Sequence, residues 1–245
     1  MPPHGCDGHS HDHEHAESDD TNPSLGTSLR PSIDFHNVVC LNESRPNSGR
    51  DVLKLHEDRL SSFPSLLSQE DPDEEPELLL IVPFVEAVTI RSVCVLSHAH
   101  RAPRSSSSSE VTTTTAPPRT LRVYANRPNL DFETVRDLDP DATIMLVPPS
   151  HQWDASHATG TIDYPLRPAG RFHNVSEIAL YFGDNYGVDV DDDGHDTVQT
   201  EITYVGFKGK GTNVRRRAVE AVYETMGMKA DHKQPGNEYF ARQGL

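Results

Sequence analysis

The chain has 245 residues, 34% of them hydrophobic, and a formal net charge of −16. This length and apolar content suit one hydrophobic core with long loops better than two separate cores. The negative charge excludes nucleic acids and anionic membrane surfaces as expected partners, because both would repel the chain. Positive charge clusters only at Arg215, Arg216 and Arg217, and no segment approaches the roughly 20 apolar residues of a membrane span.

The start of the chain and its cysteines indicate the compartment. The first residues are polar and rich in histidine, without the basic and apolar regions of a secretory signal peptide. The three cysteines, Cys6, Cys40 and Cys94, are odd in number and widely spaced, which is typical of reduced thiols. We therefore expect a cytoplasmic and nuclear protein, and we also expect a monomer that uses no cofactor.

The first quarter of the chain predicts a tail followed by one strand. Residues 1–30 contain little that can be buried, so we expect them to be disordered. A short apolar run at 38–41 predicts the first strand, and the polar residues 42–49 predict a turn. Pro64 limits any helix within 51–67 to one or two turns.

The next third of the chain predicts three strands and one long insertion. The apolar run 78–82 predicts a buried strand that ends at Pro83, and a second strand, rich in β-branched residues, is expected at 85–96. Residues 101–118 contain five serines and four threonines in unbroken runs, which predicts a mobile insertion. The alternating segment 120–125 predicts a half-buried strand.

Further apolar segments bounded by Pro, Gly, Asn or Asp predict the remaining strands. Residues 218–226 fit both helical spacing and alternation, and the family resemblance described below favours a strand there. Eight or nine short strands with few helices predict an all-β sandwich. The other predicted strands are 143–147, 161–166, 176–182 and 201–207.

Histidine is concentrated in the N-terminal tail and at His98 and His100, and both groups are candidate metal ligands. The imidazoles and carboxylates of the tail can bind Zn²⁺, Ni²⁺ or Cu²⁺, although such tracts often only increase solubility. His98 and His100 share one face of an extended strand but need a third ligand, so we predict no metal site. The tail ligands are His4, Cys6, His9, His11, His13 and His15, and the candidate third ligands are His151, His157 and His173.

Two glycine-containing segments match ligand-binding loops only in part. Asp189–Gly194 matches the first half of a calcium-binding EF-hand loop, but its twelfth position falls on Thr200, so a solvated acidic loop is expected. Gly206–Gly211 lacks the Gly-Lys-Ser/Thr sequence and the following helix of a phosphate-binding loop. We expect a strand that runs into a turn there.

Catalytic motifs are missing from the sequence. Serines and histidines are abundant, but no Gly-x-Ser-x-Gly elbow or Cys-x-x-Cys pair is present. Asn42 and Ser44 match a glycosylation sequon, and we interpret them as turn residues whose side chains bond the local backbone. The sequence therefore predicts a protein that is not an enzyme.

Six short segments carry a resemblance to a known family: Cys40–Ser44, Leu78–Phe84, Leu121–Pro128, Arg171–Val175, Phe182–Val188 and Tyr204–Gly209. Together they resemble the PITH family, the proteasome-interacting domain that is found after thioredoxin. The resemblance implies a jelly-roll β-sandwich, similar to Doc1-type and galactose-binding-like domains. In two-domain members, this domain tethers a thioredoxin to the 26S proteasome regulatory particle.

The resemblance also implies a division of the chain. A PITH domain is expected at 21–228, interrupted by the Ser/Thr-rich insertion at 101–118. A His- and Asp-rich tail precedes it at 1–20, and a C-terminal tail follows at 229–245. No thioredoxin segment stands in these residues, so the chain resembles the stand-alone members of the family.

Two functions follow as expectations. The first is a non-catalytic protein-interaction module that docks to the proteasome regulatory particle or another large assembly, with Arg215–Arg217 as its interaction patch. The alternative is a small-ligand sandwich that binds a sugar or a metal. In that case Trp153, beside His151 and His157, is the candidate for stacking on a sugar ring, and the tail histidines are the candidates for metal.

Overall fold

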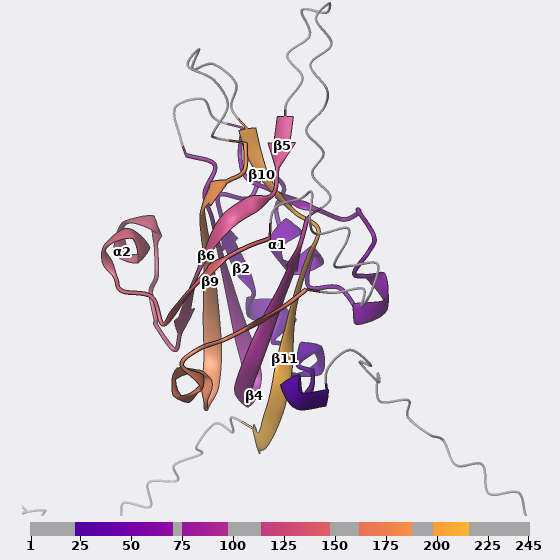
Figure 1. The fold of residues 1–245 in the computed structure, drawn as a ribbon, viewed down its shortest axis with the longest axis vertical. Coiled ribbons are helices and arrows are strands. Elements are labelled where there is room, and N and C mark those ends of the chain that lie inside the picture. Colours follow the sequence, from indigo (N-terminus) through magenta and orange to yellow (C-terminus); the bar gives the residue numbers. More distant parts are fainter. Residues whose placement is uncertain (1–22, 71–74, 98–113, 148–161, 188–197, 216–245) are drawn as a thin grey trace, which may run out of the picture.

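The computed structural model describes residues 23–70, 75–97, 114–147, 162–187 and 198–215 (Figure 1). Strands dominate this part of the chain, and its helices are short. The strands are β1 (Thr27–Ser28), β2 (Val39–Leu41), β3 (Leu66–Leu67), β4 (Leu78–Leu96), β5 (Thr114–Ala116), β6 (Pro118–Ala125), β7 (Ala142–Met145), β8 (Asp163–Pro165), β9 (Val175–Asn185), β10 (Val198–Ile202) and β11 (Tyr204–Arg215). The α-helices are α1 (Ser48–Asp51) and α2 (Phe132–Asp137), and 3-10 turns lie at Pro23–Leu25, Arg30–Ser32, Phe35–Asn37, His56–Asp58 and Ala169–Phe172.

The long strand β4 belongs to both layers of the fold. Its first half pairs with β2 and β9, and after an irregularity between Pro83 and Val88 its second half pairs with β11 and β8. The main sheet therefore runs β1-β11-β4-β9-β6-β7, with β2 and β8 also on β4, and a smaller sheet runs β3-β10-β5. A strand that changes layers through a bulge makes a corner of a sandwich. This is the all-β sandwich that the strand pattern predicts, with the jelly-roll architecture that the family resemblance implies.

The main core lies between the two halves of β4 and their neighbours. Residues of β4 point into it in alternation, with a change of phase between Ile90 and Val93. Aliphatic residues of β6 and β9 belong to the same cluster, as do aromatic residues such as Phe172 and Phe207. On the outer face of the β9 side, a smaller cluster that includes Leu79, Tyr124 and Val135 seats α2 against the sheet (Figure 1). The core residues of β4 are Leu78, Leu80, Val82, Phe84, Val88, Ile90, Val93 and Val95.

The two strands predicted at 78–82 and 85–96 form one strand, so the prediction that Pro83 ends a strand is wrong. Proline interrupts a strand by lacking an N–H donor, but it is tolerated where the ladder is already irregular. Pro83 stands at the register shift of β4, and its carbonyl accepts a hydrogen bond from Asp34 N at 2.9 Å.

Residues 23–30 belong to the segment that composition predicts as disordered, but part of this segment packs on the sandwich. β1 pairs with β11 at Lys208 and Gly209, and Leu29 is 2% exposed within the main core. Gly26 has φ 91°, and a Cβ there would lie 2.1 Å from the Gly209 carbonyl oxygen. Strand pairing with β11, one buried leucine and a close backbone contact therefore hold a segment whose composition indicates disorder.

Most of the other predicted strands are present. Those at 38–41, 120–125, 143–147, 161–166 and 176–182 correspond to β2, β6, β7, β8 and β9. Two boundaries differ from the prediction. The segment 201–207 divides at Thr203 between β10 and β11, which lie in different sheets. The Ser/Thr-rich insertion ends before residue 118, because β5 begins at Thr114 and pairs with β10. Residues 218–226 lie outside the described residues.

Side chains rather than periodicity start both α-helices. The Glu43 carboxylate accepts hydrogen bonds from Asn47 N, Ser48 Oγ and Gly49 N, which fixes α1 after β2. The Asp131 carboxylate caps α2 by accepting from Thr134 N at 2.7 Å. Within the described ranges, no helix has both the length and the apolar character needed to cross a bilayer.

Candidate functional site

Two arginines converge on one buried carboxylate near the start of β9. Asp141 is 7% exposed, and its Oδ1 atom lies 3.2 Å from Nη1 of Arg171 and 3.5 Å from Nη2 of Arg127. Its Oδ2 atom accepts a hydrogen bond from the buried N–H of Ala125 at 2.9 Å. The carboxylate is thereby anchored in the sandwich, while the side chains of Arg127 and Arg171 stay 44% and 53% exposed.

The loops that carry the two arginines are joined to each other. Asn126 and Asn174 both have positive φ, at 55° and 56°, a conformation that asparagine adopts more readily than most residues. The Asn126 side chain donates to Asn174 O at 3.1 Å and accepts from Ser176 N at 2.8 Å and Ser176 Oγ at 2.9 Å. The positions of the arginines are therefore set by backbone geometry and side-chain hydrogen bonds.

The predicted patch Arg215–Arg217 starts at the same end of the sandwich. Arg215 lies opposite Glu86 of β4, two residues before the point where β4 pairs with the first residue of β9. In Figure 1, β11 ends and β9 begins at the lower end of the sandwich. Arg216 and Arg217 lie outside the described residues. We call the surface that carries Arg127 and Arg171, together with the end of β11 at Arg215, the basic end.

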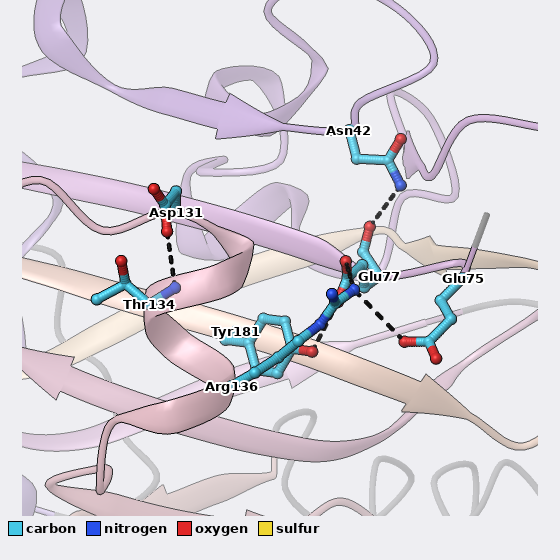
Figure 2. A network of polar contacts seen from close by, with 7 residues as sticks. All are labelled: Asn42, Glu75, Glu77, Asp131, Thr134, Arg136 and Tyr181. Atoms are coloured by element: carbon cyan, nitrogen blue, oxygen red, sulfur yellow. Dashed lines mark hydrogen bonds and ion pairs between the residues drawn. The ribbon is translucent and has the colours of Figure 1, made fainter.

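A second polar network fastens α2 to the sheet (Figure 2). Glu77 is 5% exposed; one of its carboxylate oxygens binds Arg136, and the other accepts from the Tyr181 hydroxyl at 2.7 Å. Asn42 Nδ2 donates to Glu77 O at 2.8 Å, and Arg136 lies 3.7 Å from the Glu75 carboxylate. Both carboxylate oxygens of Glu77 have partners, so this network is a structural clamp.

Burial raises the pKa of Tyr181 in the clamp and of the two described cysteines. Burial and the hydrogen bond to Glu77 raise the pKa of Tyr181 from 10.0 to about 12, which keeps its hydroxyl a donor. Burial raises the pKa of both Cys40 and Cys94 well above the ordinary thiol value. A thiol is nucleophilic only as a thiolate, so these two cysteines suit packing rather than chemistry.

The Gly206–Gly211 segment does not form a loop, so the predicted turn is wrong. It lies inside β11, which continues to Arg215. Lys208, which a phosphate loop would direct to its ligand, instead binds Asp163 of β8 at 2.8 Å, with the two side chains 6% and 11% exposed. This ion pair crosses the outer face of β4, which separates β11 from β8 in the sheet.

The metal and sugar candidates fall mostly outside the described residues. These include the tail histidines with Cys6, the pair His98 and His100, the acidic loop 189–194, and the sugar candidates at 151–157 with Trp153. His173 is described; it is exposed, and its Nδ1 lies 3.1 Å from Thr89 Oγ1. In the part of the chain that the structure describes, no three His, Cys, Asp or Glu residues gather as a metal site.

Sequence reasoning missed Arg127 and Asp141 as site residues. Arg127 and Arg171 both fall in segments that carry the family resemblance, and this was the only available signal. Asp141 belongs to no such segment, and its link to Arg171 spans 30 residues of sequence. The charge cluster appears only when the loops after β6 and β8 meet in space.

Several solved structures resemble this fold at low sequence identity. One is the family 32 carbohydrate-binding module from C. perfringens NanJ, solved in complex with galactose, with a TM-score of 0.43 and 8% identity over 74% of this chain and 97% of that chain. Another is a carbohydrate-binding module from a family 31 glycoside hydrolase of Clostridium perfringens, with a TM-score of 0.41 and 10% identity over 73% of this chain and 95% of that chain.

Relatives in sequence cover nearly the whole chain. The PITH domain-containing protein CG6153 of Drosophila melanogaster is 30% identical over 93% of both chains. The human PITH domain-containing protein 1 is 29% identical, over 85% of this chain and 82% of its own. The family model of the PITH domain matches residues 19–227, so this chain belongs to the PITH domain family.

Proposed function

We propose that this chain is a non-catalytic protein-interaction module that docks on the 26S proteasome regulatory particle through its basic end. Membership in the PITH domain family carries the proposal, because the resemblance of the six segments implies tethering to that particle. The basic end supports it, since Arg127 and Arg171 lie together there and β11 ends there at the start of the Arg215–Arg217 sequence, in a chain of net charge −16. A local charge opposite to that of the rest of the molecule orients an approaching partner.

The absence of catalysis is part of the same proposal. Glu77, Asp141 and Lys208 are buried and ion-paired, buried Lys54 donates to Ser61 O, and these contacts connect elements of the fold. Burial raises the pKa of the thiols of Cys40 and Cys94, which opposes their use as nucleophiles. These features favour binding rather than bond making. The proposal further places the protein in the cytoplasm and nucleus, as a monomer.

Capture of purified 26S proteasome tests the docking function. The biotinylated full-length chain, immobilised on streptavidin, is mixed with the particle at low and at physiological ionic strength, and mass spectrometry identifies the bound subunits. We expect regulatory-particle subunits to be recovered, with less recovery as salt increases. Recovery of no such subunits at low salt would contradict the proposal.

Charge reversal tests whether the basic end makes the contact. Changing Arg215, Arg216 and Arg217 together to Glu should weaken docking about tenfold and flatten its salt dependence. The control is Arg50→Glu in α1, which changes an exposed arginine outside the basic end. Equal weakening by the control would indicate a general charge effect rather than a dock at this end.

A further inference from the structure

We infer that Arg127 and Arg171 form a binding site for the side-chain carboxylate of an acidic protein segment. Each guanidinium has five N–H donors. Among the described residues, the Asp141 carboxylate is the acceptor for both guanidiniums, and each of them contacts its Oδ1 atom. Most of the donors of two roughly half-exposed arginines therefore remain available to a ligand from solution.

Asp141 makes these arginines a prearranged pair. The carboxylate accepts a hydrogen bond from the Ala125 N–H, and the Asp141 N–H donates to Val123 O at 2.8 Å. These two bonds fix Asp141 beside the end of β6, directly before β7. Both guanidiniums lie within 3.5 Å of the same oxygen and must therefore lie close together. Planar guanidiniums in a fixed arrangement match the two oxygens of a carboxylate and lose little freedom on binding.

The charge of the site favours a carboxylate over a phosphate. Two arginines and one aspartate leave one net positive charge, which one carboxylate neutralises. A phosphate carries nearly two negative charges at neutral pH and would bring the second of them beside Asp141. The backbone of β11 ends at the same end of the sandwich, and the sequence there reads Arg215-Arg216-Arg217, so a segment with several acidic residues fits better than a single anion.

This inference rests on the proposed function only for the identity of the protein that supplies the acidic segment. The probe is therefore a capped peptide of six glutamates, added to the ¹⁵N-labelled full-length chain, with a capped peptide of six glutamines as its uncharged control. We expect saturable shifts of the amide signals of Asn126, Arg127, Asp141 and Arg171–Asn174, with a dissociation constant of about 1 mM at low salt.

Two double variants identify the groups responsible. Arg127→Gln with Arg171→Gln should weaken peptide binding about tenfold, because two exposed charge contacts are lost. Arg127→Lys with Arg171→Lys keeps a positive charge at both positions and its pairing with Asp141. This variant should bind the peptide several-fold more weakly than the original chain, because the forked donors of the guanidiniums are lost. The lysine variant decides the matter if the glutamine variant does not fold. The control Arg50→Gln should bind like the original chain.

Several outcomes would overturn the site. They are shifts confined to other residues, equal weakening by Arg50→Gln, full binding by the lysine variant, or tighter binding of inorganic phosphate than of the glutamate peptide. Peptide binding at these residues without capture of the proteasome would remove the proposed partner and keep the site. If the glutamate peptide does not bind and the lysine variant still captures the proteasome as the original chain does, the proposed partner stands and the carboxylate site is removed.

Discussion

At the scale of single residues, Asp141 is the group on which the basic end depends. It is the buried acceptor for Ala125 N–H and the shared partner of two arginines that remain half exposed. Exposed ion pairs contribute little to stability, whereas a buried donor without an acceptor costs more. Most of the stabilising effect of Asp141 should therefore come from its backbone hydrogen bond.

The substitutions Asp141→Ala and Asp141→Asn separate these two contributions. The alanine variant should lose about 1–3 kcal/mol of unfolding free energy, because the buried Ala125 N–H keeps no acceptor. The asparagine variant keeps an acceptor oxygen and should lose clearly less. Urea denaturation with an unchanged m value measures both. Equal losses in the two variants would show that the ion pairs are the larger contribution.

At the scale of elements, the Glu77 clamp explains why a six-residue helix has a fixed place. α2 is too short to be stable alone. It is held by Val135 in the outer cluster, by the Asp131 cap, and by the bond from Arg136 to Glu77, whose second oxygen receives the Tyr181 hydroxyl. A buried carboxylate that keeps every partner stabilises such a contact, and one that loses a partner destabilises it.

The pH dependence of stability tests the clamp. The pKa of Tyr181 rises from 10.0 to about 12 on folding, so its contribution is complete below about pH 10 and is lost as pH rises through about 12. Tyr181→Phe should cost about 1–3 kcal/mol at neutral pH by leaving one Glu77 oxygen without a donor. It should also lose less stability than the original chain between about pH 9 and pH 12. Parallel urea midpoints for the two proteins across that range would rule out the assignment.

At the scale of the whole molecule, one core joins the two layers, while a surface loop exposes apolar side chains to solvent. Phe172, in the loop that carries Arg171, is fully buried in the main core. Phe63 is 73% exposed and Leu60 is 48% exposed, in a loop held by a bond from Lys54 Nζ to Ser61 O at 2.8 Å. Phenylalanine is therefore a core residue at position 172 and a surface residue at position 63.

The matched substitutions Phe172→Ala and Phe63→Ala test this difference. Loss of the buried ring should cost about 3–5 kcal/mol of unfolding free energy, because it leaves a cavity between the layers. Loss of the exposed ring should change stability by no more than about 0.5 kcal/mol. Thermal and urea unfolding measure both variants. A large loss from Phe63→Ala would mean that the ring packs within the fold despite its exposure.

Local patterns were enough to predict most of the sandwich and little of the site. Runs of β-branched and alternating residues identify β2, β6 and β9, because burial of one or both faces imposes that spacing. The end of a strand at Pro83 was predicted wrongly, since its tolerance depends on a bulge shared with another strand. β1 and α2 are short, and each depends on distant partners. Asp141 has no local signal at all.

Composition, charge and strand periodicity lie in the order of the residues, so the all-β class and the family can be inferred before any coordinates are known. Which residues meet across the sandwich depends on pairings between distant segments, such as Arg171 with Asp141 or Lys208 with Asp163. Those pairings arise because β4 crosses from one layer to the other and brings the loops after β6 and β8 to one end. A local pattern cannot encode that meeting, since it exists only when the core has formed.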